Sequence, residues 1–144
     1  MMLQIQRLRP TAQLPKNATP GSAGYDLCAD LDRPVVIPPR STVKVPTGLA
    51  MAIRPGLAGF VFARSGLGIN HGIVPANCVG VIDSDYRGEV LVGLYNHTDQ
   101  PFTVQPGDRI AQLVLLPVET PPVEECETLP DTQRGAGGFG STGR

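Results

Sequence analysis

Glycine and proline interrupt the chain so often that long helices are excluded, and this limits the possible folds more than any other feature. The 144 residues include 17 Gly and 15 Pro, which disfavour helix interiors and favour turns. Short apolar and β-branched runs lie between these breaks, at residues 3–8, 35–37, 42–45, 48–53, 59–63, 102–104 and 109–116. We therefore expect an all-β jelly roll, a sandwich or distorted barrel of eight to ten short strands. One helical turn near residues 65–70 is the only helix expected.

Residues 77–95 combine two strand-like runs with a polar centre. Between the runs stands Asp83-Ser-Asp-Tyr-Arg-Gly88, after which Val90, Val92 and Leu94 alternate with other residues. This pattern predicts a β-hairpin with a polar tip, and the alternation determines which face each side chain occupies. Such a tip could hold two carboxylates and a phenol close together. Taken alone, the same residues are also typical of an ordinary polar turn.

The chain divides into a body and a C-terminal extension. We expect a single jelly-roll domain over residues 1–116. Residues 117–133 contain four prolines and several acidic residues, which predicts an extended connector. Residues 134–144 form a glycine-rich arm that contains one aromatic residue, Phe139. Composition alone is also typical of a disordered end, but glycine amides can approach a phosphate closely and an aromatic ring can stack on a base.

Charge and cysteine content exclude several classes of function. The net charge of −1 argues against nucleic acid as a partner, because such partners usually require a basic face. No apolar run approaches the ~18 residues of a membrane span, and residues 1–10 lack the apolar core of a signal peptide. The three cysteines include no C-x-x-C pair, which argues against zinc or a disulfide framework and fits a reducing cytoplasm. Each cysteine is expected to be a small buried apolar residue.

Five stretches, in order, resemble the motifs of the homotrimeric dUTP nucleotidohydrolases (dUTPases). They are Ala23-Gly-Tyr-Asp-Leu27, Arg64-Ser-Gly-Leu-Gly68, Gly80-Val-Ile-Asp-Ser-Asp-Tyr86, Gly107-Asp-Arg-Ile-Ala-Gln112 and Arg134-Gly-Ala-Gly-Gly-Phe-Gly-Ser-Thr142. Each motif alone is weak, but five in order over nearly the whole chain are highly specific. One departure is Ala63, where proline commonly precedes the Arg-Ser pair. The resemblance implies a jelly-roll homotrimer with shared active sites that hydrolyses dUTP to dUMP and pyrophosphate.

The resemblance also implies roles for the residues near the polar centre. Asp83 matches the carboxylate that deprotonates the attacking water. Since a carboxylate is a weak base, much of the rate must come from positioning. Tyr86 matches the aromatic residue that lies under the deoxyribose and excludes a 2′-hydroxyl. Asn77, with the neighbouring backbone, resembles the uracil-binding group. Asp85 is expected to stabilise the turn, while His71 and His97 are not expected to take part in chemistry.

Further matching residues are implied to bind the triphosphate. Arg64, Ser65 and Gly66 match the motif that holds the phosphate chain, and Gln112 matches a further phosphate contact. In the arm, the residues implied to bind the γ-phosphate are Arg134, Ser141 and Thr142, and Phe139 is implied to cover the uracil. Mg²⁺ is the implied cofactor, chelated by the phosphates, with Asp26 touching it only through water. Arg109 is interpreted as structural.

Two alternative functions remain. The first is dCTP deamination on the same fold, which requires a carboxylate on the strand after residue 88, where this chain has Gly93. The second is a jelly-roll interaction protein that binds a nucleotide without hydrolysing it. Pyrophosphate release from dUTP and ammonia release from dCTP distinguish the three functions.

Overall fold

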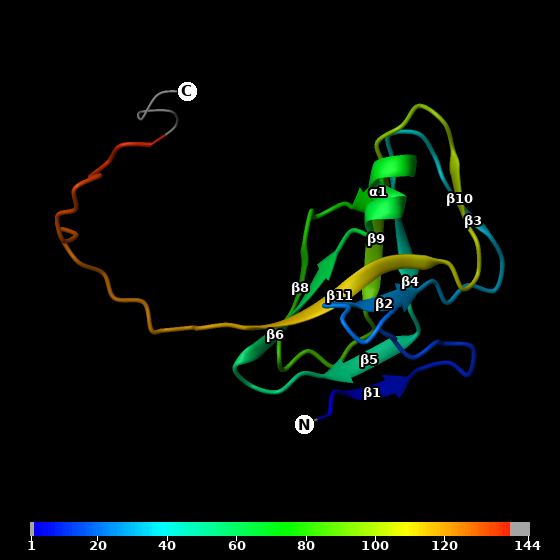
Figure 1. The fold of residues 1–144 in the computed structure, drawn as a ribbon, viewed down its shortest axis with the longest axis horizontal. Coiled ribbons are helices and arrows are strands. Elements are labelled where there is room, and N and C mark those ends of the chain that lie inside the picture. The colour runs from blue at the N-terminus through cyan, green and yellow to red at the C-terminus, as the bar shows by residue number, and fades with distance from the viewer. Residues whose placement is uncertain (1, 139–144) are drawn as a thin grey trace.

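The computed structural model describes residues 2–138, and its regular secondary structure is almost entirely strand (Figure 1). This confirms the expected all-β fold. In that range there are eleven strands: β1 (Gln4–Arg7), β2 (Tyr25–Cys28), β3 (Val35–Ile37), β4 (Thr42–Pro46), β5 (Leu49–Ala52), β6 (Leu57–Phe62), β7 (Ile73–Pro75), β8 (Gly80–Ile82), β9 (Leu91–Asn96), β10 (Phe102–Val104) and β11 (Arg109–Pro117).

The strands form two larger antiparallel sheets and two ribbons. The first sheet has the order β2-β11-β6-β8, the second has the order β4-β9-β7, and the ribbons are β1-β5 and β3-β10. Strand β11 is the centre of the first sheet, because it pairs with β2 on one side and with β6 on the other. The apolar faces share one core cluster, whose largest fully buried apolar members are Leu27, Ile37, Val45, Leu49, Ile73, Leu94, Val104, Ile110 and Leu113.

The predicted hairpin at residues 77–95 is wrong, although its two strands are present. Strand β8 pairs with β6, whereas β9 pairs with β4 and β7. Residues 83–90 therefore cross from one sheet to the other instead of joining two paired neighbours. The alternation itself is confirmed, since Val90, Val92 and Leu94 are all buried. A period of two specifies the buried face of a strand but not its neighbour, so a hairpin and a crossover have the same local pattern.

A β-bulge at the start of β11 changes which side chains share a face. The register against β2 shifts between Arg109 and Ala111, and both Ile110 and Ala111 are buried. Arg109 and Gln112 are three positions apart, so regular alternation would place them on opposite faces. The extra residue of the bulge brings both onto the face of β2 that carries Asp26.

The single helix of the described chain is α1 (Ser65–His71), which extends the predicted helical turn to seven residues. It ends at Gly72, whose φ of 65° allows its N–H to bond back to the carbonyl of Gly68. Within residues 2–138 no helix is long and apolar enough to cross a membrane.

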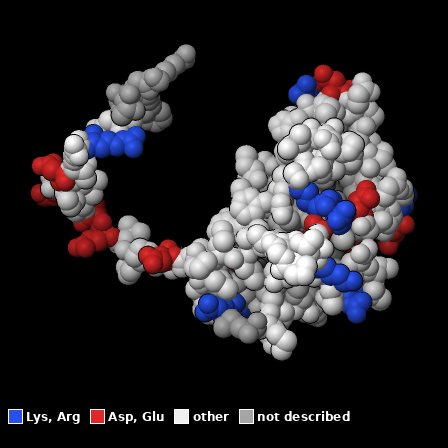
Figure 2. Space-filling view, viewed as in Figure 1, with Lys and Arg blue, Asp and Glu red and all other residues white. Residues whose placement is uncertain are grey.

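The segment after β11 leaves the body of the molecule as an extended chain (Figure 1). Residues 118–138 form no helix or strand, and residues 119–136 are all exposed. Figure 2 shows its acidic side chains on the surface of this segment; the acidic residues are Glu119, Glu124, Glu125, Glu127 and Asp131.

None of the three cysteines is fully buried, contrary to the expectation from the sequence. Cys78 and Cys126 are exposed, and only Cys28 is partly buried. Cys126 lies on the extended segment after β11. Cys78 is in a tight turn with a φ of 63°, where the backbone directs its side chain outward. Their surroundings depend on these chain paths rather than on the apolar character of the thiol.

Candidate active site

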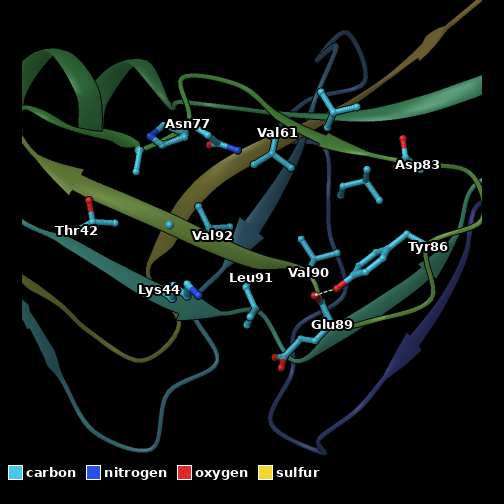
Figure 3. Close-up of a pocket in the computed structure, with 16 residues that line it drawn as sticks. Thr42, Lys44, Val61, Asn77, Asp83, Tyr86, Glu89, Val90, Leu91 and Val92 are labelled. Carbon is cyan, nitrogen blue, oxygen red and sulfur yellow. Dashed lines mark hydrogen bonds between the residues drawn. The ribbon is translucent and has the colours of Figure 1, made fainter.

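Three of the predicted site residues line one cavity between the two larger sheets (Figure 3). We call this the Asp83 cavity: it has a volume of about 450 Å³ and is lined by Asn77, Asp83 and Tyr86 together with residues of β4, β6, β8 and β9. Its walls also include Val61, Ile82, Val90 and Val92. The cavity thus combines apolar walls with a few polar groups, as small-molecule sites generally do.

Asn77 reaches this cavity because the chain turns tightly before β8. The N–H of Cys78 donates to the carbonyl of Pro75 at 3.0 Å, and the N–H of Val79 donates to the carbonyl of Asn77 at 2.7 Å. Gly80 then pairs with Val61 of β6. A Cβ at Gly80 would lie 3.1 Å from the Val61 Cβ and 3.6 Å from Asn77 Nδ2. The absence of a side chain at residue 80 therefore keeps this wall of the cavity open beside the Asn77 amide.

A turn positions Asp83 and Tyr86 where the chain leaves β8. The N–H of Tyr86 donates to the carbonyl of Asp83 at 3.2 Å, and the Tyr86 hydroxyl donates to the carbonyl of Glu89 at 3.0 Å. Asp83 is exposed at the cavity. The site therefore presents a solvent-accessible carboxylate beside an aromatic ring whose hydroxyl is hydrogen-bonded to the backbone of Glu89.

Four other predicted residues meet in a second cavity, which we call the Arg64 cavity. It has a volume of about 270 Å³, and its lining includes Asp26, Arg64, Ser65 and Gln112. Arg64 Nε donates to Asp26 Oδ1 at 2.8 Å. Gln112 Nε2 donates at 2.9 Å to the carbonyl of Ala63, the residue that replaces the usual proline. These contacts fix the Arg64 guanidinium and the Gln112 amide at the cavity, and the Ser65 hydroxyl lies on its lining; such groups suit a phosphate.

Space beside Gln112 depends on a glycine of the first motif. A Cβ at Gly24 would lie 2.9 Å from Gln112 Oε1 and 3.4 Å from the carbonyl oxygen of Leu113. A side chain at residue 24 would therefore require the Gln112 amide to move from its position beside the loop that leads into β2.

The two cavities share no lining residue in one chain. Strand β6 borders both, because Val61 lines the Asp83 cavity and Arg64 follows the end of the strand.

Gly66 lines neither cavity and lies in the first turn of α1, where nothing stands within 4 Å of a Cβ position. Arg134 lies on the extended segment, and its Nε donates to the carbonyl of Gly137 at 2.8 Å. Phe139, Ser141 and Thr142 are outside the described residues.

Comparison with known proteins identifies the family. A model of the dUTPase family matches residues 11–143. The chain belongs to the dUTPase family. This confirms the resemblance seen in the five motifs, and it makes the chain a hydrolase.

Relatives and solved structures agree with the dUTPase assignment. The deoxyuridine 5′-triphosphate nucleotidohydrolase of Desulfitobacterium hafniense strain DCB-2 is 54% identical over 132 residues, which cover 91% of this chain and 87% of that protein. The protein of the same name from Ectopseudomonas mendocina is 54% identical over 138 residues, covering 95% and 91%. A solved mutant dUTPase of Staphylococcus bacteriophage 80alpha, with dUpNHpp, has a TM-score of 0.90 at 26% identity and covers 99% of both chains.

Three residues of this dUTPase either line one of the two cavities or contact a residue that does, although the sequence did not assign them to the site. Arg109, interpreted from sequence as structural, donates from Nη1 to Asp26 Oδ2 at 3.2 Å, so Asp26 is paired with two arginines. Lys44 and Glu89 line the Asp83 cavity. Glu89 lies just beyond the third dUTPase motif, which is a signal that could have marked it. Lys44 reaches the cavity only because β4 pairs with β9, and nothing in its own segment indicates this.

The residues around Asp26 are compatible with a hydrated magnesium ion. Within residues 2–138 no three His, Cys, Asp or Glu side chains are grouped to hold a metal. Each oxygen of Asp26 accepts one N–H, from Arg64 or Arg109, whereas a carboxylate offers about four lone-pair positions. Asp26 therefore retains acceptor capacity for water molecules around a hydrated Mg²⁺.

Proposed function

We propose that the protein hydrolyses dUTP to dUMP and pyrophosphate. The observation that carries this proposal is the Asp83 cavity, which brings Asn77, Asp83 and Tyr86 together in a chain of the dUTPase family. Its volume of about 450 Å³ is within the usual range for small-molecule sites.

Asp83 is the proposed general base. Its carboxylate takes a proton from a water molecule, whose oxygen forms a bond to the α-phosphorus. The bond from that phosphorus to the bridging oxygen breaks, and the electron pair leaves with pyrophosphate. Because a carboxylate is a weak base, the geometry of the bound water supplies much of the rate.

Selectivity is assigned to the other two residues of the cavity. The Asn77 amide and the backbone beside β8 offer donors and acceptors to the edge of uracil. Tyr86 would occupy the space that a 2′-hydroxyl requires, which favours deoxyribose over ribose.

The triphosphate is assigned to Arg64, Ser65, Gly66 and Gln112, with Asp26 beside them. Mg²⁺, when bound with the nucleotide, would neutralise charge on the phosphate oxygens. Asp26 is proposed to accept hydrogen bonds from its water molecules.

A homotrimer is proposed because the site residues of one chain line two separate cavities. The Asp83 and Arg64 cavities share no residue within the chain, so apposition of two subunits would join a base-and-sugar half to a phosphate half. The arm, residues 134–144, is proposed to come from a third subunit, contributing Arg134, Phe139, Ser141 and Thr142.

The connector, residues 117–133, contains five acidic residues and no Lys or Arg. It would repel a triphosphate, so the connector itself is not proposed to bind phosphate.

In the cell, the reaction would remove dUTP from the nucleotide pool and supply dUMP for thymidylate synthesis in the cytoplasm. No nucleic acid or membrane partner is required.

Pyrophosphate release tests the proposal with dUTP, dCTP, dTTP, dATP, dGTP and UTP in the presence of Mg²⁺. We expect rapid release from dUTP alone, and the absence of release from dUTP would refute the proposal. Ammonia release from dCTP would identify a deaminase instead. That alternative is disfavoured because Gly93 provides no carboxylate on β9 and Glu89 Oε1 already accepts the N–H of Gly48 at 2.8 Å.

A further inference from the structure

The Tyr86 ring is held by the residues that follow it in the chain. Its hydroxyl donates to the Glu89 carbonyl at 3.0 Å, and this contact is visible at the wall of the Asp83 cavity (Figure 3). Tyr86 is 46% exposed, so packing alone leaves much of the ring unconstrained. Its orientation therefore depends on the position of the Glu89 backbone and on the space beside the ring.

Gly88 provides that space. A Cβ at residue 88 would lie 2.6 Å from Tyr86 Cζ and 3.0 Å from Cε2, and the three atoms nearest to it all belong to the Tyr86 side chain. Gly88 does not have a positive φ, so the backbone itself accepts alanine there. A methyl group at residue 88 would consequently displace the Tyr86 ring rather than strain the chain.

The Glu89 backbone is anchored to buried residues between β4 and β5. Glu89 Oε1 accepts the N–H of Gly48 at 2.8 Å. The next residue, Val90, accepts the Thr47 hydroxyl at 2.7 Å and donates its N–H to the carbonyl of Leu49 at 2.8 Å. Three consecutive residues, all buried, thus hold residues 89 and 90 in place.

Gly48 in turn has little freedom to move. Its φ is 65°, and a Cβ there would lie 2.7 Å from the Ala12 Cβ and 2.9 Å from Asp30 Cγ. Asp30 is buried and accepts Arg9 Nε at 2.8 Å. The anchor of Glu89 is therefore part of the rigid core of the jelly roll.

We propose that Gly88 and Glu89 are positioning residues for Tyr86 and set the preference of the enzyme for deoxyribose over ribose. This rests on the proposed dUTP hydrolysis and on the placement of Tyr86 beneath the sugar. Gly88 permits the ring to lie against the chain, and the Glu89 side chain fixes the carbonyl that receives the Tyr86 hydroxyl. Sugar selectivity then depends on the path of residues 88–90 as well as on the aromatic ring.

The test compares kcat/KM for dUTP and UTP in the full-length protein. The variants are Gly88→Ala, Glu89→Ala and Glu89→Gln. Tyr86→Ala is the reference, because it removes the aromatic ring entirely. Gly21→Ala is the matched control, because no atom lies within 4 Å of a Cβ at that position and its φ is not positive. A crystal structure of Gly88→Ala gives a readout that does not depend on activity.

We expect Gly88→Ala to lower the dUTP/UTP ratio by about tenfold or more, the scale of one methyl-sized change in a binding pocket. Glu89→Ala should lower the dUTP/UTP ratio. Glu89→Gln keeps an acceptor oxygen for the N–H of Gly48, so its ratio should stay close to that of the wild type. In the crystal, the Tyr86 hydroxyl of Gly88→Ala should no longer contact the Glu89 carbonyl. If the two residues had a purely structural role, the variants would lower kcat/KM for dUTP and for UTP by the same factor.

The outcomes separate this inference from the proposed function. A wild-type protein that releases no pyrophosphate from dUTP refutes the function, and the Tyr86 position in the Gly88→Ala crystal still decides whether residue 88 positions the ring. An active wild type with unchanged dUTP/UTP ratios in Gly88→Ala and Glu89→Ala overturns the inference alone. If Gly88→Ala fails to fold, the Glu89→Ala and Glu89→Gln pair decides.

Discussion

Asp83 differs from Asp26, the other carboxylate assigned a role in the proposed site, because it forms no ion pair within residues 2–138. Asp26 forms ion pairs with Arg64 and Arg109, and Asp30 is paired with Arg9. Among the ion pairs of residues 2–138, none includes Asp83. An unpaired, exposed carboxylate is free to accept a hydrogen bond from a water molecule, which suits a general base.

Replacement of Asp83 by Asn should separate binding from catalysis. The amide keeps the shape of the side chain but cannot take a proton, so kcat for dUTP should fall by about 10²–10⁴-fold. Binding of dUTP, measured by titration calorimetry, should change little. A variant with nearly normal kcat would remove Asp83 from the role of base.

Cys28 should react with thiol reagents much more slowly than the other two cysteines. Burial, followed by the negative charge of Asp26, raises the pKa of the Cys28 thiol, and Arg109 and Arg64 only partly oppose this. Less thiolate is then present at a given pH, and the thiolate is the reactive form. Labelling near pH 7.5 should modify Cys78 and Cys126 first, and a higher pH should accelerate Cys28. Equal rates at all three sites would contradict the raised pKa.

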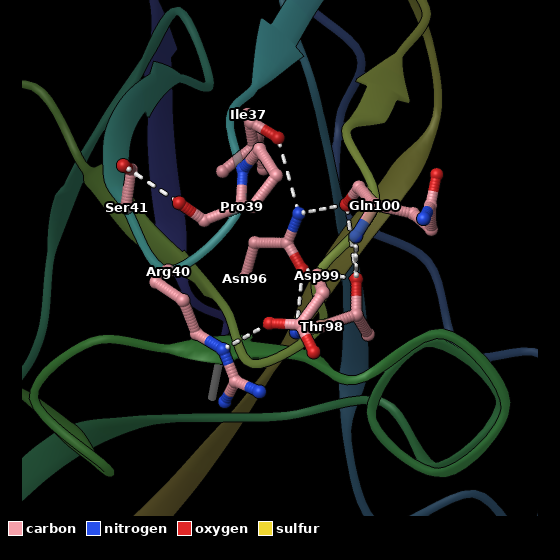
Figure 4. Close-up of polar contacts among 8 residues, drawn as sticks. All are labelled: Ile37, Pro39, Arg40, Ser41, Asn96, Thr98, Asp99 and Gln100. Atoms are coloured by element: carbon pink, nitrogen blue, oxygen red, sulfur yellow. Dashed lines mark hydrogen bonds and ion pairs between the residues drawn. The ribbon is translucent and has the colours of Figure 1, made fainter.

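At the scale of elements, one buried amide ties two turns to the end of β9 (Figure 4). Asn96 Nδ2 donates to the carbonyls of Ile37 at 3.1 Å and Gln100 at 2.8 Å. Its Oδ1 accepts the N–H of Thr98 at 2.9 Å and the Thr98 hydroxyl at 2.8 Å. This fully buried side chain therefore connects β3, β9 and the turn that leads to β10, and nearly all its hydrogen-bonding capacity is used.

Replacing Asn96 by Ala should destabilise the fold without touching the site. Buried carbonyl and N–H groups would lose their partner, and each such loss typically costs about 1–3 kcal/mol, so we expect a decrease of about 2–4 kcal/mol in the free energy of unfolding. Urea unfolding at fixed protein concentration measures this. Gln100→Ala is the control, because its hydrogen bonds in this cluster come from the backbone. Equal stability of the two variants would show that the Asn96 contacts are unimportant.

At the scale of the whole molecule, the body leaves apolar side chains and strand edges exposed. Val81, Leu91 and Ile69 are 60%, 50% and 82% exposed, and β8 is an edge strand of its sheet in the single chain. Such surfaces favour association. We therefore expect light scattering to give the mass of three 15.2 kDa chains at micromolar concentration. A monomer under those conditions would refute the trimer and the shared site.

Mixed trimers test whether the arm serves a different chain. Residues 117–130, if extended at ~3.1 Å per residue, span roughly 40 Å, which is enough to reach another subunit. Deletion of residues 134–144 should leave a folded trimer with little activity. Mixing that deletion with Asp83→Asn, after mild dissociation and reassembly, should restore part of the activity. If mixed trimers form but remain inactive, each arm must act on the Asp83 of its own chain.

The sequence by itself determined the family and most of the local elements, although strands β2 and β7 were not expected from it. Glycine and proline predicted the positions of the turns, and alternation predicted the buried face of β9. The five motifs indicated the dUTPase family. These features are local, since they depend on backbone preference and on the period of two along a strand. The residues proposed to line the Asp83 cavity are close in sequence, so their grouping was predictable.

Only the tertiary structure decided which strands are neighbours. The pairing of β8 with β6 and of β9 with β4 and β7 turned the expected hairpin into a crossover, and this pairing brought Lys44 to the cavity. The bulge in β11 placed Arg109 and Gln112 on the face of Asp26. Strand pairing and register are long-range choices set by how whole faces pack, and a local pattern that is compatible with several partners cannot select among them.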